Sequence, residues 1–197
     1  METKWLNETT LQGDTVTLLP LSLKHRDSLV EAAKDGKLWE LWYTSVPSEK
    51  EIDIYIETAF QQYEKDSSLP FVVLHNKTQK IIGSTRFLNA NSKVKRVEIG
   101  STWYAKSFQR TAVNTECKLL LLQYAFEKLN CVAVEFRTHF HNHKSRKAIA
   151  NLGAKQDGIL RNHTIDKVGN LRDTVVFSIL NSEWNVVKTA LSHRLNQ

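Results

Sequence analysis

The stretch that decides the fold runs from Val94 to Glu116 and has the sequence VKRVEIGSTWYAKSFQRTAVNTE. Its first part is rich in β-branched and aromatic residues, which predicts a strand over Val94–Tyr104. Glutamate is uncommon inside strands. Glu98 therefore belongs either to a solvated outer face or to a cleft, where its carboxylate can accept a proton. Strict alternation would place Val97, Ile99, Ser101 and Trp103 on one face and Arg96, Glu98, Gly100 and Thr102 on the other.

The second part of the stretch, QRTAVNTE at residues 109–116, leads into a helix that we predict from about Val113 to Leu129. The N-terminus of a helix presents unpaired N–H groups and the positive end of the helix dipole, so a pyrophosphate can bind there. Arg110 adds a positive charge to this loop. An ordinary helix start, capped by Thr111 or Asn114, is the alternative that the loop leaves open.

The segments on either side of this stretch alternate between strand and helix patterns. The clearest helix follows the capping box Ser48–Glu51 and carries apolar residues at helical spacing from Ile52 to Tyr63. Further helices are predicted over residues 24–34 and 145–152 and from about residue 182, and further strands over residues 15–19, 70–75, 80–88, 131–138, 154–163 and 172–180. This order predicts a mixed α/β fold, and residues 1–197 show no change in composition that would divide them into domains.

The composition is typical of a globular protein, with 41% hydrophobic and 24% charged residues. The longest purely apolar runs, such as Leu119–Leu122, are far shorter than a membrane span, and the opening Met1–Trp5 lacks the pattern of a signal peptide. Cys117 and Cys131 have no metal-ligand spacing around them, which favours two packed, reduced thiols. We therefore expect a cytoplasmic protein that does not associate with membranes.

The charge balance permits an anionic ligand. The net charge is +6 and the isoelectric point is near 9.3, which would suit nucleic acid or a phosphate-bearing cofactor. The basic residues are dispersed, however, and the tightest cluster is Lys93–Arg96. Because no nucleic-acid-binding motif is present, a nucleic-acid-binding domain is the least favoured of our interpretations.

A third candidate segment is His139–Lys147, with the sequence HFHNHKSRK. Three histidines at alternate positions, His139, His141 and His143, could suggest zinc, but no further ligand has a diagnostic spacing. We expect no metal and exposed histidines. Asn142 and Ser145, at a predicted strand-to-helix turn, are better candidates because their amide and hydroxyl groups can bond a ligand's amides.

Together these motifs resemble the GNAT acetyltransferase superfamily, within the branch of ribosomal-protein N-terminal alanine/serine acetyltransferases and their relatives. The resemblance extends from about Leu11 to Leu191, and it rests on a Glu-Ile-Gly strand, a Gln-x-x-Ala-x-Asn loop and an Asn-x-x-Ser turn before a helix that ends Asn-Leu-Gly-Ala. It implies a curved, mixed and mostly antiparallel sheet that is splayed between its fourth and fifth strands. Acetyl-CoA would lie in the splay, and its acetyl group would pass directly to a primary amine of a protein N-terminus or a small molecule.

The resemblance also implies roles for individual residues. Glu98 would be the general base, acting through water, and Ser145 would give a proton to the leaving thiolate. Main-chain groups of Trp103 and Tyr104 would contact the pantetheine arm and the thioester. The residues implied in binding acetyl-CoA are Trp103, Tyr104, Gln109, Arg110, Thr111, Ala112, Val113, Asn114, Thr115, Asn142, Ser145 and Lys147.

The loop departs from the family pattern. The family usually has glycine where this chain has Ala112, and glycine or alanine where it has Asn114. A Cβ atom near the phosphates can weaken binding, so a catalytically degenerate module that binds CoA or regulates is an alternative. The acceptor site would be walled by Trp39, Trp42 and Tyr43, unless these aromatic residues belong to the core. A monomer and a homodimer are equally compatible with the sequence.

Overall fold

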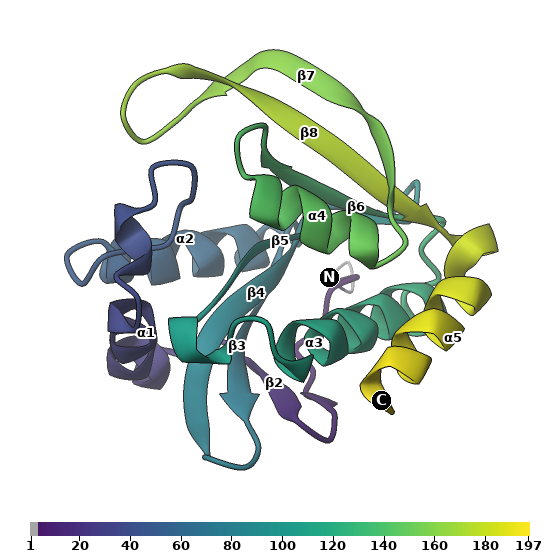
Figure 1. Ribbon diagram of the computed structural model, residues 1–197, viewed down its shortest axis with the longest axis horizontal. Coiled ribbons are helices and arrows are strands. Elements are labelled where there is room, and N and C mark those ends of the chain that lie inside the picture. Colours follow the sequence, from purple (N-terminus) through teal and green to yellow (C-terminus); the bar gives the residue numbers. More distant parts are fainter. Residues whose placement is uncertain (1–3) are drawn as a thin grey trace.

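The computed structural model describes residues 4–197, so Met1–Thr3 of the opening segment lie outside it. Eight strands form one sheet in the order β1-β2-β3-β4-β5-β6-β8-β7 (Figure 1). The strands are β1 (Leu11–Gln12), β2 (Val16–Pro20), β3 (Leu69–His75), β4 (Lys80–Asn91), β5 (Arg96–Tyr104), β6 (Ala133–His139), β7 (Lys155–Ile165) and β8 (Leu171–Leu180). Every neighbouring pair is antiparallel except β5 and β6. The expected mixed, mostly antiparallel sheet is confirmed.

Helices cover the sheet on both faces. The helices are α1 (Arg26–Lys34), α2 (Ile52–Glu64), α3 (Ala112–Gln123), α4 (His143–Asn151) and α5 (Trp184–Leu195). Helix α2 buries Ile52, Ile56 and Ala59, which lie on one stripe of the helix because they are spaced by four and three residues. One core lies under α1 and α2, and a larger one lies under α3 and α5. Each face of the sheet is therefore closed by apolar helix stripes.

The sheet opens between β5 and β6. These two strands pair only at Arg96↔Ala133, Val97↔Val134 and Glu98↔Glu135. Beyond that point β5 continues beside β4, and β6 continues beside β8. Along the rest of their length, the edges of β5 and β6 that face each other therefore do not pair with each other. This opening is the splay that was expected between the fourth and fifth predicted strands. Those two strands are β5 and β6, because the prediction did not include the short strand β1.

Strand β5 contains a bulge. Ser84 pairs with Trp103 and Arg86 with Gly100, so Thr85 is opposed by the two residues Ser101 and Thr102, and Ser101 has a φ of 46°. One extra residue reverses which face the following side chains occupy. The predicted alternation is therefore wrong after Gly100: Trp103 packs under α1 and α2, whereas Tyr104 joins Val97 and Ile99 in the other core.

Most element boundaries agree with the predictions to within a few residues. Helix α3 continues into a π-helical turn at Tyr124–Lys128, which completes the long helix expected there. Helix α4 begins at His143, two residues earlier than predicted, and Gly153 ends it with a φ of 99°. Cys117 and Cys131 are free and buried, as expected. Among residues 4–197, no helix combines the length and the apolar character needed to cross a membrane.

Candidate active site

Glu98 lies at the point where β5 and β6 separate, and it is only 7% exposed. Its Oε2 accepts a hydrogen bond of 2.7 Å from Asn89 Nδ2 and lies 3.7 Å from Arg137 Nε. The carboxylate extends over Gly100, where a Cβ atom would come within 2.8 Å of Oε1. A solvated outer face is therefore excluded for Glu98, and the glycine two residues later leaves the space that this carboxylate occupies.

The electrostatics of Glu98 are dominated by burial. Burial raises the pKa of this carboxyl above its ordinary value, although Asn89 and Arg137 favour its charged form. Arg137 is shared with Glu135, which also pairs with Arg96 at 3.1 Å. A buried carboxyl that is raised in pKa yet retains a hydrogen bond and a nearby cation can accept a proton at a higher pH than an exposed glutamate can.

The loop before α3 is closed by its own side chains. Gln109 Nε2 donates to the carbonyl of Tyr104 at 3.0 Å, and Arg110 has a left-handed backbone with a φ of 63°. Thr111 caps α3: its Oγ1 accepts from Val113 N–H at 3.3 Å and donates to the carbonyl of Phe108. The capped helix start is therefore present, and residues 109–112 are exposed at the positive end of α3.

The two residues that depart from the family loop do not strain it. Ala112 is the first residue of α3 and Asn114 lies in its first turn, and neither has a positive φ. Ordinary helical backbone accepts a Cβ atom at both positions. The side chain of Val113, in contrast, is buried in the core and can offer a ligand only its backbone.

Trp103 and Tyr104, the two aromatic residues at the end of β5, have buried side chains. Trp103 Nε1 donates to Tyr55 OH at 3.3 Å on α2. The Tyr104 side chain is buried beside Cys117 in the core under α3, and burial raises the pKa of its hydroxyl. Both side chains therefore point into the core, so any contact of these two residues with a ligand would come from their main chain.

The turn between β6 and α4 brings Asn142 and Ser145 together. Asn142 is the N-cap of α4, and its Oδ1 accepts from Ser145 N–H at 3.0 Å. The Asn142 amide group Nδ2 is left to bond a ligand, and Ser145 lies half-buried in the first turn of the helix. Lys147 is exposed on the same helix.

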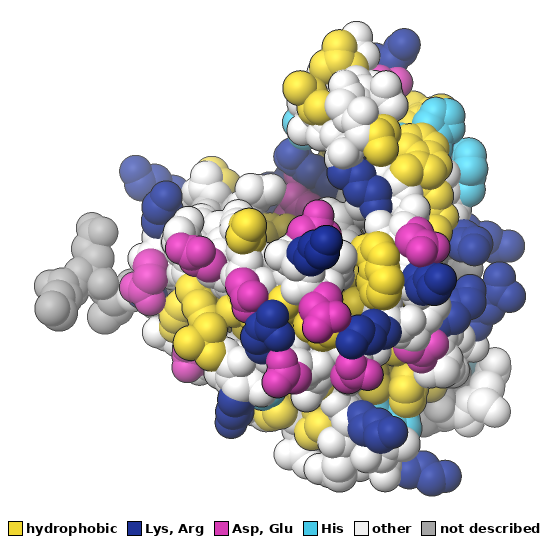
Figure 2. All heavy atoms as spheres, turned by 90° about the vertical axis from the view of Figure 1, so that its left-hand side faces the viewer, with side chains coloured by type: hydrophobic (Ala, Val, Ile, Leu, Met, Phe, Trp, Pro, Cys, Tyr) yellow, Lys and Arg dark blue, Asp and Glu magenta, His cyan; other side chains and the backbone are white. Residues whose placement is uncertain are grey.

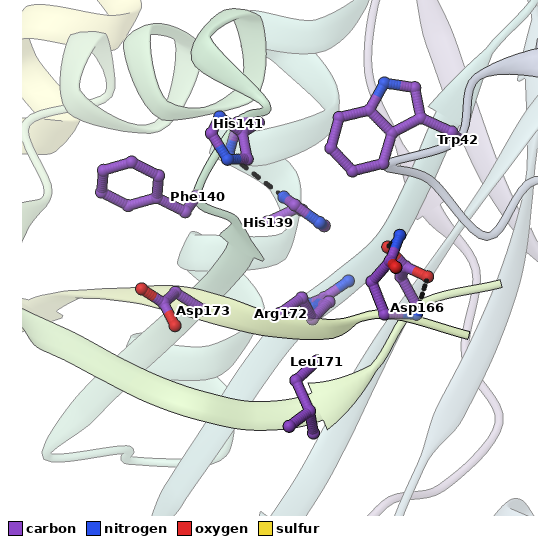
Figure 3. A pocket seen from close by; sticks show the side chains of 9 residues that line it. Trp42, His139, Phe140, His141, Asp166, Leu171, Arg172 and Asp173 are labelled. Atoms are coloured by element: carbon purple, nitrogen blue, oxygen red, sulfur yellow. Dashed lines mark hydrogen bonds between the residues drawn. The ribbon is translucent and has the colours of Figure 1, made fainter. Parts of the chain in front are cut away.

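A cavity of about 280 Å³ begins where β6 ends (Figure 3). It lies between the loop that follows α1 and the hairpin of β7 and β8, and its lining includes Trp42, His139, His141, Asp166, Arg172 and Asp173. The prediction of exposed histidines is wrong for His139, which is 3% exposed because the Trp42 ring packs edge-on against it at 4.9 Å. His141 and His143 are exposed. Within the described chain, no three His, Cys, Asp or Glu side chains are grouped as metal ligands.

Of the three aromatic residues expected to wall the acceptor site, only Trp42 lines this cavity. Tyr43 packs edge-on against Trp42 with ring centroids 5.6 Å apart, and Trp39 packs against the core under α1 and α2. The carbonyl of Trp39 accepts a hydrogen bond from Lys167 at the tip of the β7–β8 hairpin. This hydrogen bond connects the loop that contains Trp39 and Trp42 to the β7–β8 hairpin, so the two walls of the cavity are linked directly.

The hairpin contributes the residues that the sequence did not indicate. Asp166 lies in the turn that follows β7, Arg172 and Asp173 lie at the start of β8, and no motif marks them. Figure 2 shows the molecule from the side of α1 and α2, where acidic and basic side chains are intermixed. Apart from a group of Lys and Arg side chains at the right edge of the view, basic side chains on this face alternate with acidic ones.

Comparisons with known proteins agree with this fold. A family model described as an acetyltransferase (GNAT) domain matches residues 15–155. The chain is 25% identical over 183 residues to a protein of Bacillus licheniformis named uncharacterized N-acetyltransferase p20, which covers 89% of this chain and 98% of the relative. A crystal structure of a GCN5-related N-acetyltransferase from Brucella melitensis is 29% identical with a TM-score of 0.85, covering 96% of this chain and 86% of that one. Mycobacterium smegmatis RimJ in complex with CoA-disulfide shares the fold, with a TM-score of 0.77 at 18% identity and coverage of 91% and 88%. The chain belongs to the GNAT acetyltransferase family.

Proposed function

We propose that the protein is an N-acetyltransferase that uses acetyl-CoA and passes the acetyl group directly to a primary amine. The observation that carries this proposal is the buried Glu98 carboxyl at the foot of the opening between β5 and β6. A proton acceptor at this point lies beside strand edges whose backbone groups are free to bind a ligand. The family match makes acyl transfer the chemistry expected of such a site.

The residues present suit acetyl-CoA. The exposed start of α3 offers backbone N–H groups and the side chain of Arg110 to a pyrophosphate. The free edge of β5 offers backbone groups to the amides of a pantetheine arm, and the Asn142 amide group lies across the opening from it. When bound, acetyl-CoA would supply the acetyl group in activated form as a thioester.

Glu98 would remove the proton that keeps the amine from attacking. A primary amine is mostly protonated at neutral pH and becomes a nucleophile only after it loses a proton. Burial raises the pKa of Glu98, which makes its carboxylate a stronger base than an exposed glutamate. We expect the proton to pass to Glu98 through water. Ser145, in the first turn of α4, would donate a proton to the departing thiolate.

The decisive experiment replaces Glu98 by glutamine and measures turnover and CoA binding separately. Turnover should fall by roughly 10²- to 10⁴-fold, which is the usual contribution of a general base. The thermal shift caused by CoA should remain, because the carboxylate lies at the reacting end rather than at the pyrophosphate end. In the wild type, kcat/KM should fall as the pH is lowered, and the midpoint of this fall should lie at a higher pH than the pKa of an ordinary glutamate. The fall should be absent in Glu98→Gln.

Glu127→Gln is the matched control, because that carboxylate pairs with Lys188 away from the opening. Nearly full activity of Glu98→Gln with a good acceptor would remove Glu98 from the mechanism. A wild-type protein that binds CoA but acetylates no member of a broad panel of amines and peptides would instead be the degenerate module.

A further inference from the structure

The cavity at the end of β6 contains two buried hydrogen-bond donors that have no partner. Within residues 4–197, neither His139 Nε2 nor Arg172 Nε meets a hydrogen-bonding group. His139 is nine-tenths buried or more, and both side chains line the cavity. Figure 3 shows His139 below Trp42, with Arg172 next to it on β8. An unpaired buried polar group is costly, so these two atoms call for an explanation.

The hydrogen bonds around His139 fix which of its nitrogens carries the proton. The backbone N–H of His141 donates to His139 Nδ1 at 3.1 Å (dashed in Figure 3), so Nδ1 is the acceptor. Burial and the charge of Arg172 both lower the pKa of His139, which keeps the ring neutral at physiological pH. The proton of the neutral ring must then be on Nε2. His139 therefore carries, in the wall of the cavity, a buried N–H donor for which the described residues provide no acceptor.

Arg172 presents a positive charge there. Its Nη2 donates to Thr174 Oγ1 at 3.3 Å, and no carboxylate of the described chain lies within ion-pair distance of its guanidinium. Burial lowers the pKa of Arg172, which Asp166 only partly offsets. A half-buried guanidinium loses part of its favourable hydration free energy, and without a carboxylate partner no ion pair offsets that loss.

The two acidic residues in the lining are already engaged within the hairpin. Asp166 Oδ1 accepts from the backbone N–H groups of Val168 and Asn170, both at 2.9 Å. Asp173 accepts from the backbone of Asn162 at 2.8 Å and pairs with Arg161 at 2.8 Å. These carboxylates hold the turn in shape. Among the buried polar atoms of the lining within residues 4–197, the two left without a partner are both donors, and one of them belongs to a cation.

We propose that this cavity binds a carboxylate of the acceptor, which accepts hydrogen bonds from His139 Nε2 and from the guanidinium of Arg172. The proposal rests on the function proposed above and names the class of acceptor: an amine that also carries a carboxylate. A volume of about 280 Å³ is at the small end for ligand sites, so it suits one amino-acid side chain or a small amino acid. The Trp42 ring covers the aliphatic part of such a group.

The carboxylate could belong to a free amino acid or to the first side chain of a peptide. The first arm of the test therefore compares free glutamate with glutamine, and the second compares peptides that begin with Glu and Gln and end in an amide. Binding is measured by calorimetry in the presence of CoA, and kcat/KM is measured separately with acetyl-CoA. The wild type should favour the carboxylate in at least one arm by about 10- to 100-fold, as a charge-assisted hydrogen bond provides.

Arg172→Gln should remove that preference, chiefly through KM, because the variant lacks the cation that the carboxylate contacts. Arg161→Gln is the matched control, because Arg161 lies on the same hairpin with a side chain 81% exposed and pairs with Asp173. It should keep the preference. Melting temperatures of both variants show whether the hairpin is intact.

The outcomes separate the two proposals. Equal binding and equal turnover of Glu and Gln acceptors by the wild type would overturn the carboxylate site while the acetyltransferase stands. Preferential binding of the carboxylate without turnover of any acceptor would overturn the enzymatic proposal and support the site. A preference that survives in Arg172→Gln would also overturn the inference.

Discussion

Lys118 on α3 is a buried lysine, so it offers a direct test of how the burial of a charge affects the stability of the fold. It is 5% exposed, and its Nζ donates to Thr102 Oγ1 at 2.6 Å. No carboxylate within the described residues pairs with it. Burial lowers the pKa of Lys118 from 10.5 to about 8. Each tenfold loss of proton affinity is worth about 1.4 kcal/mol, so the charged lysine costs the folded state about 3 kcal/mol.

The sign of the pH dependence follows from the lowered pKa. Below pH 8 the lysine is protonated in both the folded and the unfolded chain, and the full penalty acts. As the pH rises from 8 toward 10.5, the folded chain has lost this proton while the unfolded chain still binds it, so the penalty fades. Lys118→Met keeps the length of the side chain and removes the charge. At pH 7 its free energy of unfolding should exceed that of the wild type by about 1 to 3 kcal/mol, the lower figure allowing for the lost hydrogen bond to Thr102.

The assay is urea denaturation of both proteins at pH 7, 8, 9 and 10. The advantage of Lys118→Met should shrink by about 2 kcal/mol between pH 8 and pH 10. Groups that titrate in both proteins cancel in this difference. Lys128→Met serves as the control because Lys128 is exposed on the same helical segment, and it should change stability little at any pH. A difference that stays constant with pH, or a Lys118→Met variant that is less stable throughout, would refute the reasoning.

Three further outcomes are expected. Millimolar CoA should raise the melting temperature, and both Arg110→Ala and added salt should reduce this shift; an unchanged shift in the variant would place the pyrophosphate elsewhere. Ser145→Ala should lower turnover by less than Glu98→Gln does, because water can replace a hydroxyl donor, and a larger loss in steady-state kinetics would contradict this. Glu116 accepts backbone hydrogen bonds from Asp14, Thr15 and Val16. Glu116→Gln should therefore cost about 2 to 4 kcal/mol in denaturation experiments, and a loss below the error of the measurement would show that these bonds are replaceable.

Local patterns predicted most of the helices and strands because each is set by residues close in sequence. The stripe of Ile52, Ile56 and Ala59 faces the core whatever the rest of the chain does, and the glycine at position 153 ends α4 where its left-handed backbone is needed. The opening between β5 and β6 was anticipated only through the resemblance to a family. No local pattern states how far two strands pair.

The acceptor side was harder to predict because its residues are brought together by tertiary contacts. Trp42, His139 and Arg172 come from a loop, the end of β6 and the start of β8. The burial of His139 depends on the Trp42 ring, which lies about a hundred positions away in the chain. Periodicity correctly placed His139 at a strand end, but it could not indicate that a distant indole covers that end.

The bulge in β5 connects the site with the buried lysine. Glu98 and Gly100 share a face up to Ser101, and the extra residue then turns Trp103 rather than Thr102 to that same face, where Trp103 meets Tyr55 on α2. Thr102 is turned to the α3 side instead, and it becomes the partner of Lys118. A strictly alternating strand would have left Trp103 among the residues under α3 and Lys118 without this hydroxyl. The irregularity that makes the predicted alternation wrong thus decides which core Trp103 and Tyr104 enter, and it places Trp103 on the face of the sheet that α1 and α2 cover.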